Sequence, residues 1–276
     1  MDKDQYYLQI QGAAEYLKKH LRTSPEVAIV LGTGLGNLSD RIEDPQVFPY
    51  ENIPHFPQIT VKGHEGNLIC GKIEGKDVMA MQGRFHYYEG YSMKEVTFPM
   101  RVMQAIGIET ILISNAAGGV NEEYNVGDIV LVTDHISLHQ DNPLRGENDN
   151  RLGTRFPDMF STYDTDLIHK SEEIAKANKI KVHRGVYFGW PGPNLETPAE
   201  YNMINTLGGD LVGMSTIPEV LVAKHAGMRI LVASVVTNEC FPIGRLSPTG
   251  HDEVIDVAKI AEPNLTKIIS ELIANL

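Results

Sequence analysis

The most concentrated group of candidate functional side chains lies in the segment 82–91, QGRFHYYEGY. It carries Arg84, His86 and Tyr88, and residues two apart in an extended chain point to the same side. The guanidinium of arginine offers a planar fork of donors that suits phosphate, and histidine titrates near neutral pH and can donate to a phosphate oxygen. The segment therefore predicts an oxyanion site. The alternative is a solvated strand edge on which Arg84 pairs with Glu89.

Two further segments are candidates for the same anion site. The glycine-rich run GTGLG, residues 32–36, allows close approach of the backbone to a ligand, and Thr33 adds a hydroxyl. Ser215 directly precedes a predicted helix, whose N-terminal N–H groups favour an anion. A tight turn and a helix cap at Ser215 or Thr216 are the structural alternatives. GTGLG matches neither the dinucleotide fingerprint G-x-G-x-x-G nor the P-loop, which excludes those two phosphate motifs.

Two glutamates in the run PGPNLETPAE have different expected roles. Thr197 and Glu200 have the spacing of a capping box, with a proline at the first helical position, so Glu200 has a structural function. Glu196 precedes the cap and has no such explanation, which makes it the better candidate for a ligand-binding carboxylate. Asn238 ends a strongly apolar strand and offers both a donor and an acceptor. A turn-forming asparagine is the alternative there.

The sequence carries no strong signal for a metal site or a covalent nucleophile. His135 and His139 are four residues apart, but TDHISLH is expected to be a strand that runs into a loop, so they need not share a face. Cys70 and Cys240 form no C-x-x-C pair, and no Gly-x-Ser-x-Gly elbow is present. We therefore expect no metal.

Composition limits the partners that the protein can have. The 276 residues carry a formal net charge of −12, which argues against non-specific binding to nucleic acid. The longest apolar runs, such as Val27–Leu31 and Ile230–Val236, are too short to span a bilayer. The first 21 residues lack the apolar core of a signal peptide, and two cysteines make no disulfide framework. A cytoplasmic protein without a nucleic-acid or membrane partner is expected.

Strands and helices alternate along the chain, without a linker or a repeat, which favours one α/β domain over residues 1–276 with a mostly parallel, helix-flanked sheet. The polar stretch 140–164 is expected to be a functional loop. The expected strands are Val27–Gly32, Asn67–Ile73, Asp77–Met81, the strand and glycine turn of TILISNAAGG, Asp128–Thr133, Gly185–Trp190, Leu211–Met214 and Ile230–Thr237. The expected helices are an N-terminal one ending before Thr23, 92–106, Thr165–Asn178, Thr216–Ala226 and Asp252–Asn275, kinked at Pro263.

Almost every candidate functional residue follows one of these strands. In open α/β sheets, ligands bind beyond the carboxyl ends of the strands. The strand ends carry GTGLG, QGRFHYYEGY, SNAAGG, PGPNLETPAE, GMSTIPE and TNECF, each rich in glycine or small polar residues. We therefore expect these segments to meet in one site.

In order and spacing, the motifs resemble those of the trimeric, low-molecular-mass purine nucleoside phosphorylases over essentially the whole chain. The resemblance implies a single three-layer α/β domain around a mixed, partly barrel-like sheet. It implies phosphorolysis of inosine, guanosine and their 2'-deoxy forms to free purine and pentose 1-phosphate, with orthophosphate as co-substrate and no cofactor. The matching strings are GTGLG, PHFP with VKGHEG, QGRFHYYEGY, SNAAGG, VTDHI, NPLRG with RFPDM, PGPNLETPAE, GMSTIPE, and TN followed by His251.

The resemblance also implies a role for each matching residue, with His86, Glu196 and Asn238 as the catalytic set. The implied phosphate ligands are Thr33, His64, Arg84, His86, Ala116 through its N–H, and Ser215. Tyr88, Met214 and His251 are the implied ribose contacts, joined by Phe156 from the neighbouring subunit of a homotrimer. Tyr187, Leu195, Glu196 and Asn238 are the implied base contacts. Leu195 stands where the family often has phenylalanine, and Glu239 where many animal relatives have lysine, so fine specificity stays open.

Three other functions compete with this one. A 5'-methylthioadenosine phosphorylase of the same family needs a group that accepts from the 6-amino group, and Asn238 without a neighbouring aspartate disfavours it. A catalytically silent nucleoside-binding module would not need the cradle of Arg84, His86 and Ser215. A Rossmann oxidoreductase is disfavoured by the glycine spacing.

Overall fold

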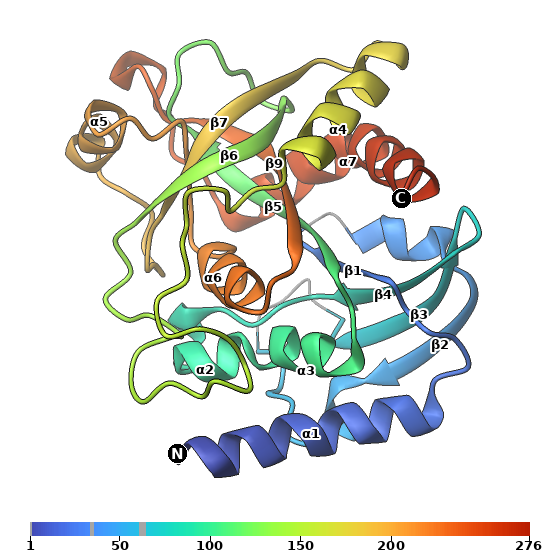
Figure 1. The fold of residues 1–276 in the computed structure, drawn as a ribbon. Coiled ribbons are helices and arrows are strands. Elements are labelled where there is room, and N and C mark those ends of the chain that lie inside the picture. Colours follow the sequence, from blue (N-terminus) through green and yellow to red (C-terminus); the bar gives the residue numbers. More distant parts are fainter. Residues whose placement is uncertain (1, 34–35, 61–64) are drawn as a thin grey trace.

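The computed structural model describes residues 2–33, 36–60 and 65–276, drawn as a ribbon in Figure 1. Its strands are β1 (Val27–Leu31), β2 (Glu43–Pro49), β3 (Asn67–Ile73), β4 (Lys76–Gln82), β5 (Thr110–Gly119), β6 (Ile129–Ser137), β7 (Val182–Gly189), β8 (Leu211–Gly213) and β9 (Arg229–Glu239). Its α-helices are α1 (Lys3–His20), α2 (Met93–Val96), α3 (Phe98–Ile106), α4 (Thr165–Ala177), α5 (Pro198–Thr206), α6 (Ile217–His225) and α7 (His251–Ala274).

In the described residues the strands form one nine-stranded sheet in the order β2-β3-β4-β1-β5-β8-β7-β6-β9. β5 also pairs with β9, so the last five strands of this order close into a barrel. β1 lies parallel to both β4 and β5, whereas β2 and β3 add an antiparallel edge. Inside the barrel, parallel pairs mix with the antiparallel pairs β5–β8 and β6–β9. The predicted α/β fold, with its mixed and partly barrel-like sheet, is confirmed.

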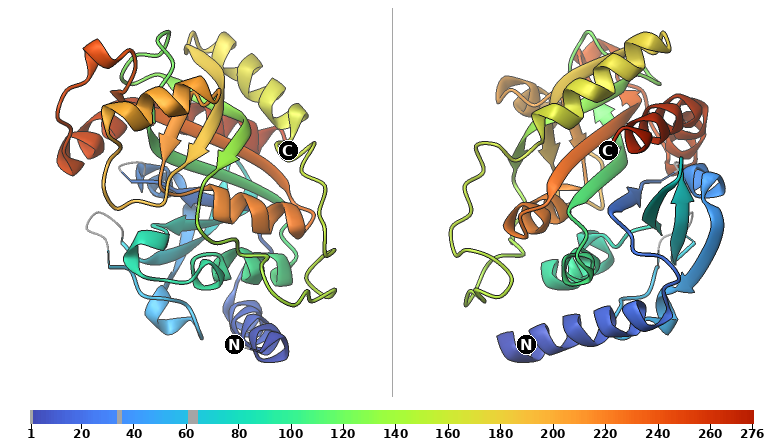
Figure 2. Two further views of the ribbon diagram at one scale, coloured as in Figure 1. Left: turned by 90° about the vertical axis from the view of Figure 1, so that its left-hand side faces the viewer. Right: turned by 45° about the vertical axis from the view of Figure 1, so that its right-hand side comes forward.

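The helices cover this sheet from two sides, as the two views in Figure 2 show. On one side α1 packs on α3, and α3 packs on α6; on the other side α4 packs on α7, and α7 packs on β9. Because both faces are covered, all five residues of β1 are buried. This explains why Val27–Leu31 is an uninterrupted apolar run rather than an alternating one.

The run SNAAGG differs from its predicted form. It was expected to leave the strand in a glycine turn, but β5 continues to Gly119 because β9 pairs with it over its whole length. The two glycines allow close packing instead of a turn. A Cβ at Gly118 would lie 2.7 Å from Cys240 Sγ, and one at Gly119 would lie 2.8 Å from Val236 Cγ1.

Two other differences have local causes. The predicted helix 92–106 is broken into α2 and α3 at Thr97, two residues before Pro99, whose ring fits only the first turn of a new helix. β2 was not predicted, because only one of its seven residues is buried and Pro45 and a register shift interrupt it. The predicted capping box Thr197–Glu200 is present, and Ser92 and Glu95 form another at the start of α2.

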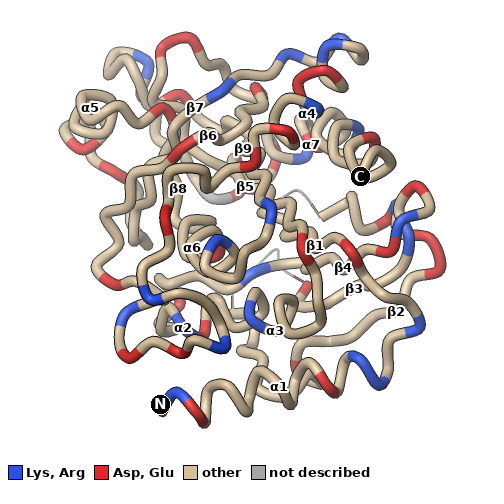
Figure 3. The backbone as a smooth tube through the Cα atoms, viewed as in Figure 1, with Lys and Arg blue, Asp and Glu red and all other residues tan. Residues whose placement is uncertain are grey.

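Charged residues of both signs are distributed over the whole fold, as the tube in Figure 3 shows. Acidic side chains outnumber basic ones, 36 to 24. Throughout the described part of the chain, no helix combines the length and apolarity needed to cross a membrane.

Candidate active site

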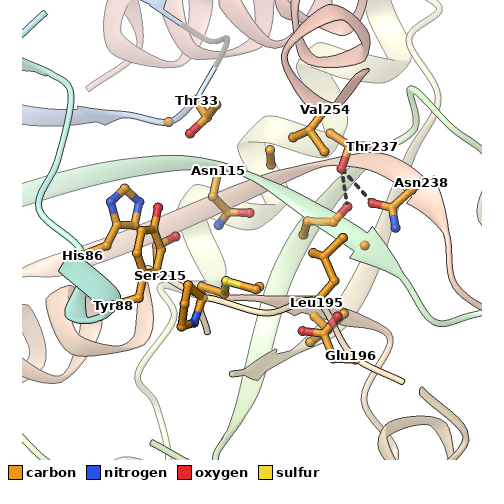
Figure 4. A pocket seen from close by; sticks show the side chains of 18 of the residues that line it. Thr33, His86, Tyr88, Asn115, Leu195, Glu196, Ser215, Thr237, Asn238 and Val254 are labelled. Atoms are coloured by element: carbon orange, nitrogen blue, oxygen red, sulfur yellow. Dashed lines mark hydrogen bonds between the residues drawn. The ribbon is translucent and has the colours of Figure 1, made fainter. Parts of the chain in front are cut away.

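A cavity of about 500 Å³ lies where the carboxyl ends of several strands meet. Its walls come from the ends of β1, β4, β5, β8 and β9, from the segment after β7, and from the start of α7. The predicted meeting of the strand-end segments in one place is what the structure shows. Figure 4 gives a close view of this cavity and its side chains.

Most of the residues singled out from the sequence line this cavity. They are Thr33, Arg84, His86, Tyr88, Ala116, Leu195, Glu196, Met214, Ser215 and Asn238. In Figure 4, Thr33, His86, Tyr88 and Ser215 lie toward one end, and Leu195, Glu196, Thr237 and Asn238 lie toward the other. The cavity therefore has an end rich in hydroxyl and cationic donors and an end with a carboxylate and an amide.

Arg84 is the centre of a buried network at the donor-rich end. Its side chain is 2% exposed, and Nη1 lies 3.4 Å from Ser215 Oγ, 3.2 Å from Thr216 Oγ1 and 3.4 Å from Glu219 Oε1. Nη2 donates to the carbonyl of Ser114. A buried guanidinium needs such partners, and Glu219 supplies the opposite charge. The network fixes the fork of Arg84 at the wall of the cavity.

Thr216 stands at the N-cap position of α6, but its side chain does not cap the helix. Its φ of 75° and ψ of −56° describe a γ-turn, closed by the Ile217 N–H donating to the Ser215 carbonyl over 2.8 Å. A β-branched residue in this conformation is strained. The Thr216 hydroxyl makes no cap and instead accepts from Arg84 and, over 3.0 Å, from Asn115 Nδ2. Glu219 pairs with Arg84, so Thr216 and Glu219 form no capping box at the start of α6.

His86 is oriented by the carboxylate of Glu89. Glu89 Oε1 accepts from the backbone N–H of His86 over 2.7 Å and lies 3.0 Å from its Nδ1. Burial alone would raise the pKa of Glu89, but hydrogen bonds from the His86 ring, Thr60 and the His86 N–H outweigh it and lower the pKa. An ionised carboxylate only accepts, so the His86 ring presents Nδ1–H to Glu89. The ring of Tyr88 stacks on His86 at 4.7 Å.

Glu196 is the carboxylate at the opposite end of the cavity. It is 9% exposed, and burial raises its pKa above the ordinary value for glutamate. A hydrogen bond to its own backbone N–H and the neighbouring Tyr201 hydroxyl lower the pKa by less than burial raises it. Asn238 lies across from it at the end of β9, where the Thr237 hydroxyl donates to Asn238 Oδ1 over 3.0 Å.

Four predicted site residues do not line the cavity or cannot be placed. Tyr187 is fully buried in β7 and packs against Gly213, so the structure does not place its ring against a base. Phe156 is 83% exposed on the loop 140–164, which runs along the outside of the molecule in Figure 2. His64 lies outside the described residues, and so does the side chain of His251, whose backbone begins α7.

Several lining residues were missed from the sequence. Thr237 and Asn115 stand beside predicted residues in the runs TNECF and SNAAGG, so their strand-end position was the available signal. Tyr201 and Val254 come from helices and carried no such signal. Glu239 pairs with Arg245 at 3.6 Å and is not part of the lining. Within the described ranges, no group of three or more His, Cys, Asp or Glu residues is arranged to hold a metal ion.

Comparison with known proteins defines the class of this fold and site. Residues 26–274 match the family model of the phosphorylase superfamily. "Purine nucleoside phosphorylase 1" of Bacillus subtilis is 49% identical over 96% of this chain and 97% of its own, and "Purine nucleoside phosphorylase" of Rattus norvegicus is 43% identical over 100% and 98%. Within the superfamily, the chain belongs to the purine nucleoside phosphorylases.

Solved structures agree with this assignment. The crystal structure of isoform 2 of the Schistosoma mansoni purine nucleoside phosphorylase, in complex with cytosine and ribose-1-phosphate, superimposes with a TM-score of 0.93 at 42% identity and covers 98% of this chain and 97% of that one. The Schistosoma mansoni enzyme in complex with inosine has a TM-score of 0.92 at 39% identity, covering 98% and 96%. The fold implied by the sequence resemblance is the fold of these enzymes.

Proposed function

We propose that the protein is a purine nucleoside phosphorylase, a pentosyltransferase that converts inosine, guanosine and their 2'-deoxy forms with orthophosphate into free purine and pentose 1-phosphate. The observation that carries the proposal is the cavity itself, which has anion donors at one end and a carboxylate with an amide at the other. Relatives 40 to 49% identical over nearly the full chain carry the same name, which supports the same reaction.

At the donor-rich end, the proposal assigns orthophosphate to the network around Arg84. Arg84 and Ser215 donate to phosphate oxygens, and His86, whose Nδ1 faces Glu89, contacts the phosphate through Nε2. Thr33 and the Ala116 N–H complete the cradle, together with His64. A phosphate held here is fixed in position before the reaction, which lowers the entropic barrier.

The ribose lies between the two ends in this proposal, against Tyr88, Met214 and His251. The C1'–N9 bond breaks first, its electron pair moves to the purine, and an oxocarbenium-like sugar results. The phosphate stabilises this positive charge, and one of its oxygens then forms the new bond to C1'. All atoms come from the two substrates, so we propose that the reaction needs no metal, cofactor or covalent enzyme intermediate.

Glu196 and Asn238 bind the departing purine, which gains negative charge at N7 and O6. Asn238 donates to this edge, where charge develops in the transition state. Glu196 accepts from N1–H and, in guanine, from the 2-amino group. Leu195 contacts the base with an aliphatic side chain. Tyr187 lies behind Gly213 with its hydroxyl beside Ser215, so this proposal gives it no stacking contact with the base.

The raised pKa of Glu196 predicts how activity depends on pH. The carboxylate must be ionised to accept from N1–H, so kcat/KM for inosine should fall as pH drops through the pKa of this group. Because burial raises that pKa, the fall should begin at a higher pH than for an exposed glutamate. A pH profile of wild type and Glu196→Gln tests this. Retention of the same acid limb in Glu196→Gln would assign it to another group.

We further propose that the active form is a homotrimer in which Phe156 covers the ribose pocket of a neighbouring subunit. The support is the family resemblance, which implies this contact, and the 83% exposure of Phe156, which leaves its ring free to meet a neighbouring subunit. Sedimentation should give about three times the 30.6 kDa mass of one chain. Phe156→Ala should raise the KM for inosine about tenfold and leave the KM for phosphate unchanged.

Phe160→Ala is the matched control for Phe156→Ala, because Phe160 lies on the same loop and is 96% exposed. It should change neither KM. A stable monomer with full activity would contradict the assembly, and equal effects of the two variants would contradict the role of Phe156.

The remaining proposals concern organisation and location. We propose one domain over residues 1–276, located in the cytoplasm, without a nucleic-acid or membrane partner. The one sheet formed by the described residues supports the single domain. The net charge of −12 argues against a nucleic-acid partner, and a chain with only two cysteines and no disulfide framework suits the cytoplasm.

The function is tested by following release of the free base from inosine, guanosine, 5'-methylthioadenosine and uridine at saturating phosphate. Inosine and guanosine should be turned over far faster than the other two. A clear preference for 5'-methylthioadenosine would instead support the related phosphorylase of that substrate, and no turnover of any of them would support a binding module.

A further inference from the structure

The Asn238 amide is held from both ends by neighbours in its own strand and in the turn that follows. The Thr237 hydroxyl donates to its Oδ1 over 3.0 Å, and its Nδ2 donates to Cys240 Sγ, also over 3.0 Å. Cys240 is fully buried and does not line the cavity. The amide orientation therefore depends on a residue that no substrate touches.

Cys240 is itself fixed in place by three contacts. Its backbone N–H donates to the Gly119 carbonyl over 2.7 Å, and its thiol lies 3.8 Å from the Asn238 carbonyl. Gly118 leaves room for the sulfur, because a Cβ there would lie 2.7 Å from Sγ. Burial raises the pKa of this thiol to about 12, so the sulfur is a neutral thiol with its proton available to the carbonyl and its lone pairs available to Asn238.

Thr237 alone does not determine which way the amide points. Its single hydroxyl proton is within reach of two acceptors, Asn238 Oδ1 at 3.0 Å and the Ala117 carbonyl at 3.3 Å. If the proton goes to Ala117, the Thr237 oxygen becomes an acceptor and suits the opposite amide orientation, with Nδ2 toward Thr237. Cys240 adds a second partner to the amide: its sulfur accepts from Nδ2 over 3.0 Å, and its thiol has an acceptor of its own in the Asn238 carbonyl at 3.8 Å.

The orientation of the Asn238 amide matters because its NH₂ group and its carbonyl group recognise different bases. An NH₂ group directed at the ligand donates to N7 or O6 of a 6-oxopurine, whereas a carbonyl in its place accepts from a 6-amino group. We propose that Cys240 is a positioning residue that orients the Asn238 amide and thereby favours 6-oxopurines over 6-aminopurines. This inference rests on the proposed purine nucleoside phosphorylase function and names a determinant of its base preference.

Tyr201 links the Asn238–Cys240 pair to Glu196. Its ring lines the cavity, and its hydroxyl lies beside both the Cys240 thiol and the Glu196 carboxylate. The Tyr201 hydroxyl donates a hydrogen bond to ionised Glu196, which leaves the Tyr201 oxygen as a further acceptor beside the thiol. The two residues that read the base are thus joined through Tyr201 and Cys240, and neither linking residue was identified from the sequence.

The test compares variants of Cys240 by the ratio of kcat/KM for inosine to kcat/KM for adenosine. Cys240→Ala and Cys240→Val both remove the sulfur acceptor, the first with a smaller side chain and the second with a branched apolar one. If one variant does not fold, the other still tests the inference. Each should lower the ratio about fivefold to tenfold, as expected for the loss of one hydrogen bond. Cys240→Ser restores a group that accepts and donates in the same way, and should return the ratio to within about twofold of wild type.

Controls separate this role from a general effect on packing or on the phosphate end. Cys70→Ala is the matched control, since Cys70 is also a free, buried cysteine, in β3 and away from the cavity. It should leave the ratio unchanged, and none of the Cys240 variants should change the KM for phosphate. Kd values for hypoxanthine and adenine, measured by calorimetry, should shift in the same sense as the kinetic ratio.

An unchanged ratio in both acceptor-free variants, or an equal loss of inosine and adenosine turnover, would overturn the inference. A ratio that falls in Cys240→Ser as far as in Cys240→Ala would also overturn it. These outcomes differ from failure of the proposed function, in which the unmodified protein itself would not release hypoxanthine from inosine in the presence of phosphate.

Discussion

Adenosine is expected to be a poorer substrate than inosine by about 10⁴-fold in kcat/KM. The site pairs with the polar edge of a 6-oxopurine, and its own buried polar groups stay unpaired when adenine is bound instead. A 6-oxopurine presents N1–H as a donor and O6 as an acceptor, and adenine presents the reverse. Ionised Glu196 only accepts, so it meets the lone pair of adenine N1. With Glu196 9% exposed, water cannot relieve that mismatch.

Variants of Glu196 and Asn238 measure how much each residue contributes to the preference for 6-oxopurines over 6-aminopurines. Asn238→Asp should shift preference toward 6-aminopurines, because a carboxylate accepts from the amino group and repels O6. Glu196→Gln should reduce kcat/KM more for guanosine than for inosine, since guanosine loses the acceptor for two donors. Glu200→Gln is the matched control, because that carboxylate caps α5 and does not line the cavity. Comparable kcat/KM values for adenosine and inosine in the wild type would contradict the assignment.

Loss of Arg84 or Ser215 should weaken phosphate use far more than purine binding. Arg84→Met and Ser215→Ala each remove a donor to a charged ligand, worth about 1.5–3 kcal/mol, so the KM for phosphate should rise about 10- to 150-fold. The Kd for hypoxanthine should stay within about twofold, because the base lies at the other end of the cavity. Steady-state kinetics with varied phosphate, together with calorimetry for the base, measure both.

Arg84→Met has a second expected effect, on stability. It leaves Glu219 as a buried carboxylate without its counter-charge, which costs about 3–5 kcal/mol of unfolding free energy. Ser215→Ala avoids this penalty and keeps the phosphate prediction testable on its own.

Two buried residues outside the cavity serve as controls for these variants. Arg101 donates to the Leu152 carbonyl and is 4% exposed, so Arg101→Met removes a buried guanidinium without touching the site. Ser171 donates to the Leu167 carbonyl inside α4, so Ser171→Ala removes a buried hydroxyl in the same way. Neither should change the KM for phosphate. Normal phosphate saturation in both Arg84→Met and Ser215→Ala would show that the anion site is misassigned.

The parts of the site that follow strands were predictable from the sequence, because strand ends converge by a general rule of α/β architecture. Arg84, Glu196, Ser215 and Asn238 were found in this way, and the structure brings them into one cavity. A capping box is also a local pattern, and Thr197 with Glu200 forms the predicted one.

Features that depend on tertiary contacts were not predictable. Thr216 and Glu219 have the spacing of a cap, but the buried charge of Arg84 recruits both side chains and leaves Thr216 in a γ-turn. Gly118 suggested a turn, yet its lack of a side chain serves packing against Cys240. Closure of the barrel by β5 and β9 likewise joins residues more than a hundred positions apart in sequence.

Phosphorolysis is tested by ³¹P NMR of a reaction between inosine and phosphate, with hypoxanthine followed in parallel. We expect a ribose 1-phosphate resonance that grows in step with hypoxanthine, and no hypoxanthine when phosphate is omitted. Release of hypoxanthine without phosphate, with free ribose as the second product, would contradict phosphorolysis and the assignment of the donor-rich end of the cavity to phosphate.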